Sequence, residues 1–143
     1  MHNVSEKPQP SLDVLIIDDD RVTCYLLTVL MKQKSLRASY VYNLGEASAT
    51  LKKQQYDILF LDNYLPDGFG VDFIEKAKQI NPGLTIIMMT AEDTFKDIEI
   101  AFTKGAEYFL PKPFTKEGIK HIFENVIPEC LKQKAQIIPR EMD

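Results

Sequence analysis

The sequence has no tryptophan, only two cysteines and no long hydrophobic run. Cys24 and Cys130 lie more than a hundred positions apart without a neighbouring histidine, so neither a disulfide framework nor a zinc site is expected, and a reducing cytosol fits best. The most apolar run, residues 84–89, is far shorter than the ~20 residues that span a bilayer. The first ten residues are polar, contain two prolines and lack the apolar core of a signal peptide. We therefore expect a cytoplasmic protein without a membrane segment.

Basic residues are fewer than acidic residues. The 17 lysines and arginines face 21 aspartates and glutamates, which gives a net charge of −4, and no basic run is interleaved with aromatic residues. This balance excludes the electrostatic footprint of a nucleic-acid binder. The 143 residues are 45% hydrophobic and 27% charged, as in one soluble domain with a sizeable core. We expect a flexible arm over residues 1–10, a domain over 11–127 and a C-terminal extension or linker stub over 128–143.

Continuous apolar runs alternate with amphipathic helical patterns along the chain. Unbroken apolar runs are typical of parallel strands that are buried on both faces. They lie at residues 14–17, 58–61 and 84–89, with weaker ones at 37–42 and 108–110. Each is followed by a segment with one apolar stripe, and the spacing allows a right-handed crossover helix every time. The pattern predicts a doubly wound α/β domain with five parallel strands.

Polar residues follow four of these runs at the point where each predicted strand ends. They are Asp18, Asp19 and Asp20; Asp62; Thr90 and Ala91; and Lys112 and Pro113. In such sheets ligands bind outside the carboxyl ends of the strands, so these residues should meet. Clustered carboxylates repel one another unless a cation holds them, and ligands that are all oxygen favour Mg²⁺. Asp62 follows a buried strand and precedes an open, turn-rich loop, so it is the best candidate to form an aspartyl phosphate.

With these motifs the sequence closely resembles the receiver domain of two-component response regulators, as found in the single-domain chemotaxis regulators. The resemblance covers roughly residues 11–126. It is carried by the aspartates after the run 14–17, by Asp57-Ile-Leu-Phe-Leu-Asp62 with Pro66 and Gly70, by Ile86-Ile-Met-Met-Thr-Ala91, and by Gly105-Ala106 leading to Lys112-Pro-Phe114. The family implies a flavodoxin-like (βα)5 fold with strand order 2-1-3-4-5.

The resemblance also implies roles for the acidic residues. Asp62 would accept a phosphoryl group from a histidine kinase or a histidine phosphotransfer protein. Asp19 and Asp62 would bind Mg²⁺ directly, with Mn²⁺ as a substitute, and Asp18 would bind it through water. The main-chain carbonyl of Tyr64 would complete the protein ligands.

The remaining residues would read the phosphoryl group. Lys112 would pair with its oxygens, the Thr90 hydroxyl would move in beside Ala91 to bond one of them, and Phe109 would swing inward. Phe109 has no hydroxyl group with which to bind a partner when it points outward. The peptide bond before Pro113 resembles the cis peptide of the family. The domain would act as a signalling switch rather than an enzyme, and would present its fourth helix, fifth strand and fifth helix to an output partner or to a second copy. The sequence names neither the kinase nor the output partner.

Other functions fit part of the pattern. Asp18-Asp-Asp20-Arg-Val22 matches the Asp-x-Asp-x-Val motif of haloacid dehalogenase-type phosphatases, with Asp18 as the nucleophile. That class needs a later acidic pair and a cap domain, and it leaves Asp62 unexplained. A receiver that is never phosphorylated and serves only as a protein-binding scaffold is a further alternative, which the complete set of site residues does not favour. A flavodoxin-like carrier of FMN is disfavoured because three aspartates would repel its phosphate.

Overall fold

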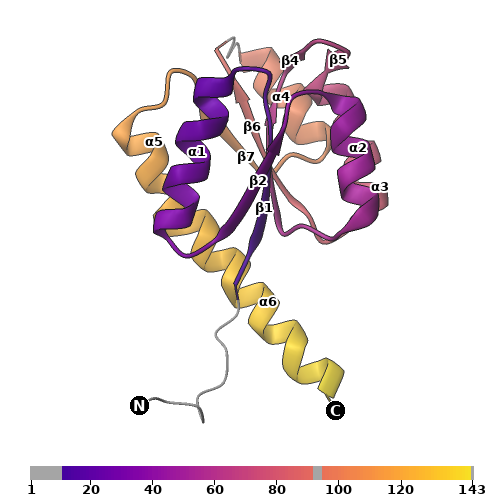
Figure 1. Cartoon of the computed structure of the whole chain (residues 1–143), viewed down its shortest axis with the longest axis vertical. Helices are drawn as coiled ribbons and strands as arrows, with labels where there is room; N and C mark the ends of the chain where they lie inside the picture. The colour runs from indigo at the N-terminus through magenta and orange to yellow at the C-terminus, as the bar shows by residue number, and fades with distance from the viewer. Residues whose placement is uncertain (1–10, 92–94, 143) are drawn as a thin grey trace.

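The computed structural model describes residues 11–91 and 95–142, so the expected N-terminal arm lies outside the described residues. A central sheet holds five parallel strands, which are β1 (Asp13–Ile17), β2 (Arg37–Val41), β3 (Ile58–Asp62), β6 (Thr85–Thr90) and β7 (Tyr108–Pro111) (Figure 1). Their order is β2-β1-β3-β6-β7. Counted along the chain, these five strands have the order 2-1-3-4-5, so the predicted flavodoxin-like topology is confirmed.

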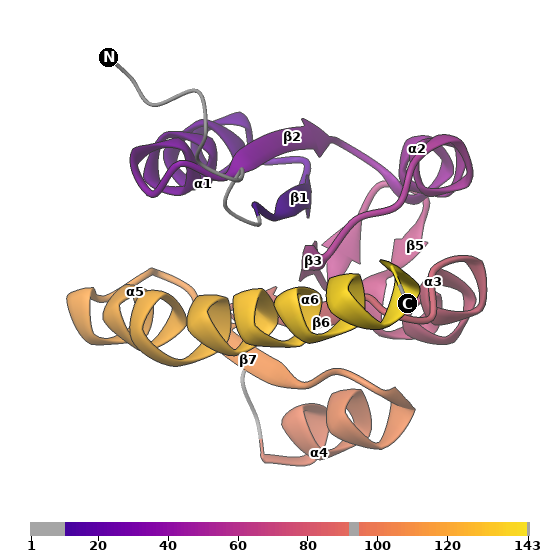
Figure 2. The same ribbon diagram turned by 90° about the horizontal axis from the view of Figure 1, so that it is seen from below.

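Helices cover both faces of the sheet, as the doubly wound pattern predicts (Figures 1 and 2). One face is packed by α1 (Arg21–Gln33) and α5 (Lys116–His121), and the other by α2 (Leu44–Lys53), α3 (Ile74–Ile80) and α4 (Phe95–Lys104). The side chain of Asp20 caps α1 by accepting a bond from Val22 N at 3.0 Å, and Asn43 caps α2 by accepting one from Glu46 N at 2.8 Å. These caps satisfy amide groups that have no partner within the helix.

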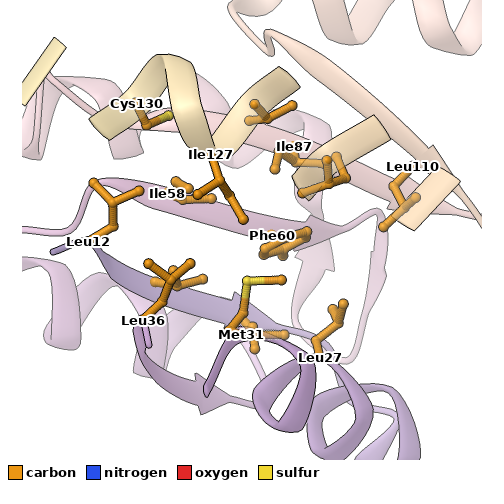
Figure 3. Close-up of a cluster of buried hydrophobic side chains, with 14 of the residues drawn as sticks. Leu12, Leu27, Met31, Leu36, Ile58, Phe60, Ile87, Leu110, Ile127 and Cys130 are labelled. Carbon is orange, nitrogen blue, oxygen red and sulfur yellow. The ribbon is translucent and has the colours of Figure 1, made fainter. Parts of the chain in front are cut away.

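The hydrophobic core consists of two layers, one on each face of the sheet. Val14 and Ile16 point to the layer under α1, whereas Leu15 and Ile17 point to the layer under α2 and α3. Figure 3 shows the first layer, in which Phe60 lies between side chains of α1 and of the C-terminal helix. Because every central strand has apolar neighbours on both faces, its sequence is a continuous apolar run rather than an alternating one.

The C-terminal helix extends the domain beneath the sheet. A π-helical segment (Ile122–Val126) joins α5 to α6 (Ile127–Met142), which crosses below the amino ends of the strands (Figure 2). Pro128 directly follows the π-helical segment, and because it has no amide proton it cannot donate the i→i−4 hydrogen bond of a regular α-helix at this point. Lys134 Nζ holds α6 in place through Asp57 Oδ2 at 3.0 Å and the carbonyl of Ser11 at 2.7 Å.

Among the residues that the structure describes, no helix combines the length and the apolar composition needed to cross a bilayer.

Candidate functional site

Three aspartates meet at the carboxyl edge of the sheet. Asp18 and Asp19 follow β1, and Asp62 ends the neighbouring strand β3; one carboxylate oxygen from each lies within 4.8 Å of the others. Asp18 is fully buried, Asp62 is 6% exposed and Asp19 is exposed. The side chain of Asp18 is held by the main chain two residues later, since its Oδ1 accepts a hydrogen bond from Asp20 N at 2.9 Å. The cluster therefore has a rigid buried part and one side open to solvent.

Asp20 differs from its two acidic neighbours. Its carboxylate accepts bonds from Val22 N at 3.0 Å and from the Thr23 hydroxyl at 2.9 Å, so both oxygens are used in capping α1. These bonds hold the pKa of Asp20 below its ordinary value. The phosphatase alternative requires Asp20 to act as the general acid and base, and a general acid must hold a proton to donate. A carboxylate whose two oxygens both accept hydrogen bonds within α1 gives no support to that role.

Lys112 lies opposite the aspartates, directly after β7. Its Nζ is 2.5 Å from Asp18 Oδ2 and 3.1 Å from Asp62 Oδ1, and its side chain is 20% exposed. The amide of Lys112 donates to the carbonyl of Thr90 at 3.1 Å, which joins the ends of β7 and β6, and the peptide bond before Pro113 is cis. The sheet thus brings together the lysine and the carboxylates that the sequence placed at separate strand ends.

The charges in this site do not balance. Three carboxylates face one ammonium group, so the site is left with two negative charges at a pH where all are ionised. Burial, together with the charge of Asp18, raises the pKa of Asp62 to about 6, although Lys112 acts in the opposite direction. Oxygen ligands with an excess negative charge and an open side fit a hard divalent cation such as Mg²⁺.

This imbalance predicts that Asp62→Asn stabilises the metal-free protein. The pKa of Asp62 is about 6 when folded and close to 3.8 when unfolded, so between these values the folded state binds more protons and loses stability as the pH rises. Well above pH 6 the full cost is present, and removing the charge should raise the free energy of unfolding by about 3 kcal/mol. Urea denaturation in EDTA at pH 4.5 and 7.5 measures this. A variant that is no more stable than the wild type at pH 7.5 contradicts the prediction.

Thr90 and Phe109 both line a small cavity. Thr90 ends β6 and is 3% exposed, Phe109 is half-buried in β7, and Ala91 is exposed directly after β6. The cavity has a volume of about 70 Å³ and is also lined by Met88 and by Asp97, Ile100 and Ala101 of α4. Residues of β6, β7 and α4 thus share this cavity.

The loop after Asp62 forms a short antiparallel hairpin of β4 (Tyr64–Leu65) and β5 (Gly68–Phe69), followed by a 3₁₀ helix (Gly70–Phe73). The rings of Tyr64 and Phe69 meet edge to face with centroids 5.6 Å apart. Tyr64 lies two residues after Asp62, and its side chain is exposed. Sequence reasoning assigned no role to Asp67 in this loop. The Asp67-Gly68 pair is a turn signal, but it does not reveal which amide groups the carboxylate meets.

Similarity to known proteins agrees with this geometry. The response regulator receiver domain model matches residues 14–124. The probable transcriptional regulatory protein TcrX of Mycobacterium tuberculosis is 29% identical over 106 residues, which cover 74% of this chain and 45% of TcrX. The chain therefore spans less than half of this curated relative.

Two solved structures have a closely similar backbone. A CheY-like response regulator receiver domain protein from Methanospirillum hungatei superposes with a TM-score of 0.78 at 22% identity, over 87% of this chain and 99% of the other. A response regulator from Burkholderia pseudomallei, solved with a phosphorylated aspartic acid, a calcium ion and citrate, gives a TM-score of 0.73 at 21% identity, over 88% and 74% of the two chains. At 22% and 21% identity, these two structures support the fold assignment alone.

Proposed function

Because this chain belongs to the response regulator receiver domain family and is a receiver of two-component signalling, we propose that Asp62 is its phosphoacceptor. The observation that carries this proposal is the position of the Asp62 carboxylate, which ends β3 within 3.1 Å of Lys112 Nζ and beside two further carboxylates. The donor is a histidine kinase or a histidine phosphotransfer protein. The Burkholderia structure, which contains a phosphorylated aspartic acid, supports the same chemistry.

The transfer exchanges one bond for another. A carboxylate oxygen of Asp62 attacks the phosphorus of the donor's phosphohistidine, the O–P bond forms, the P–N bond breaks, and the departing histidine nitrogen keeps the electron pair. Lys112 bonds Asp62 Oδ1, which orients the carboxylate. The same ammonium group lies beside the position that the phosphoryl oxygens would occupy, where it would stabilise their negative charge.

Mg²⁺ fits the acidic side of this site. We propose that Asp19, Asp62 and the main-chain carbonyl of Tyr64 bind the ion directly, and that Asp18 binds it through water. The ion would supply positive charge next to the transferred group. The raised pKa of Asp62 supports a cation at this place, because a nearby positive charge would relieve the repulsion between Asp62 and Asp18.

The proposed switch involves the ends of β6 and β7, next to Lys112. We propose that the Thr90 hydroxyl and the residue after it, Ala91, close on the phosphoryl group and that Phe109 then moves into the cavity of about 70 Å³ beside α4. Phosphorylation would shift the population toward this arrangement of α4, β7 and α5, and the output partner or a second copy would bind the changed face.

Intact mass spectrometry after incubation with Mg²⁺ and acetyl phosphate, a small phosphoryl donor, tests the phosphoacceptor. We expect the wild type to gain one phosphoryl group and Asp62→Asn to gain none. Asp20→Asn is the matched control, because Asp20 lies next to the site but serves to cap α1, so this variant should still form the adduct. An adduct that persists in Asp62→Asn, or one that maps to Asp18, overturns the proposal.

A further inference from the structure

The tip of the loop between β3 and α3 is bonded to a different helix. Asp67 Oδ1 accepts a hydrogen bond from Leu44 N, and Asp67 Oδ2 accepts one from Gly45 N, both at 2.9 Å. These two amides belong to the first turn of α2, where no carbonyl within the helix can accept from them. One exposed carboxylate therefore connects the hairpin of β4 and β5 to the start of α2. Figure 1 shows this hairpin and α2 on the same side of the molecule.

Two side chains accept hydrogen bonds from the first amide groups of α2. Asn43, the N-cap, accepts from Glu46 N at 2.8 Å and donates to the Glu46 carboxylate at 2.8 Å. Asp67 accepts from the amides of the two residues that lie between them. Its negative charge faces the positive end of the helix, and the two amide bonds hold the pKa of Asp67 below its ordinary value. Asp67 is thus a second cap, supplied by the loop that follows Asp62.

Gly68 shows independently that the loop tip is seated on α2. Its φ of +153° is unfavourable for other residues, and a Cβ at this position would lie 3.1 Å from Leu44 Cδ1. The loop backbone therefore packs against Leu44, the same residue whose amide bonds to Asp67. The contact between the loop and α2 consists of charge-assisted hydrogen bonds and close packing.

The other end of the loop is fixed at the phosphoacceptor. Gly70 N donates to the carbonyl of Asn63 at 2.8 Å, and Val71 N donates to Asn63 Oδ1 at 3.0 Å, so the base of the hairpin is closed next to Asp62. Tyr64 lies between this base and the tip. Its main-chain carbonyl is thus carried on a segment that is held on one side by Asn63 and on the other by Asp67.

We propose that Asp67 is a positioning residue for the metal site, because it holds the loop that carries the main-chain carbonyl of Tyr64, the proposed Mg²⁺ ligand two residues after Asp62. This inference rests on the proposed function, since it concerns the same Mg²⁺ site. Without the carboxylate the loop tip would keep only its packing against Leu44, and binding of the ion would have to order it further. A cap is worth about 1 kcal/mol, which corresponds to a weakening of Mg²⁺ binding of about fivefold.

The test compares two caps of the same helix. Isothermal titration calorimetry measures the Kd for Mg²⁺ in the wild type, Asp67→Ala, Asp67→Asn and Asn43→Ala. Asp67→Ala should raise the Kd about fivefold and Asp67→Asn by less, because an amide oxygen still accepts one bond. Asn43→Ala removes a cap from α2 without freeing the loop, so its Kd should stay within about twofold of the wild type although α2 is destabilised.

Hydrogen exchange in EDTA provides a readout that does not depend on the metal. Amides of residues 63–70 should exchange faster in Asp67→Ala than in Asn43→Ala. Equal Kd values for Mg²⁺ and equal loop exchange in Asp67→Ala and Asn43→Ala overturn the inference. Fraying of α2 alone would then explain both the Kd and the exchange rates. A wild type that binds no Mg²⁺ instead overturns the proposed function and this inference with it.

Discussion

Lys112→Met should lower the free energy of unfolding of the metal-free protein by about 3 kcal/mol at pH 7. The ammonium group of Lys112 contacts Asp18, which is fully buried, and Asp62, which is 6% exposed. Removal of this cation leaves two carboxylates in a poorly solvated site without a positive neighbour. Breaking a buried ion pair by removing one partner costs far more than losing an exposed pair, because the remaining charge is uncompensated.

The loss should depend on pH and on metal in a defined direction. Lys112 lowers the pKa of Asp62, so the variant should raise that pKa further, and protonation of Asp62 should restore part of the stability as the pH falls toward 5. Mg²⁺ should also restore part of it, since the ion brings positive charge to the same carboxylates.

Urea denaturation in EDTA at pH 7 and pH 5, and again with Mg²⁺ at pH 7, measures these effects. Lys120→Met is the control, because Lys120 pairs with Glu124 at 4.0 Å on an exposed face and should change stability by less than about 0.5 kcal/mol. If Lys112→Met is no less stable than this control, the electrostatic account of the site is wrong.

The sheet and the centre of the site were predictable because both follow from local pattern. A strand with apolar neighbours on two faces is an unbroken apolar run, which is visible in the sequence for Ile58–Asp62 and Thr85–Thr90. Parallel strands bring their carboxyl ends to one edge of a sheet, so the residues after those runs could be placed together before any distance was known. Lys112 and Asp18, 94 positions apart, indeed form an ion pair.

Contacts between elements that are not strand ends could not be predicted. Asp67 bonds to amides more than twenty positions earlier, and Lys134 reaches Asp57 across 77 positions. In the sequence Asp67 is a turn residue and Lys134 is one lysine among others, because nothing local encodes which distant group a side chain meets. The same holds for Gly70, whose need for a small residue arises from the packing of the loop onto Asp62.

Gly70→Ala is expected to disturb the site itself. A Cβ at Gly70 would lie 2.1 Å from the main-chain oxygen of Asp62 and 3.0 Å from Leu61 Cγ. The first of these neighbours is backbone in a central strand, so it cannot rotate away as a flexible side chain would. Relief requires the loop or the end of β3 to move, and we expect a loss of about 3 kcal/mol in the free energy of unfolding.

The same displacement should slow phosphorylation, because it moves the residue that carries the acceptor carboxylate. A misplacement of about 1 Å can cost about a hundredfold in rate, so phosphorylation by acetyl phosphate should be strongly reduced even where the variant is fully folded. Rates are measured by intact mass at a temperature well below the unfolding midpoint of the variant. Gly83→Ala is the matched control, since a Cβ there has no heavy atom within 4 Å, and it should leave stability and rate unchanged. If Gly70→Ala is phosphorylated as fast as Gly83→Ala, contact between the loop and Asp62 does not hold the acceptor in place.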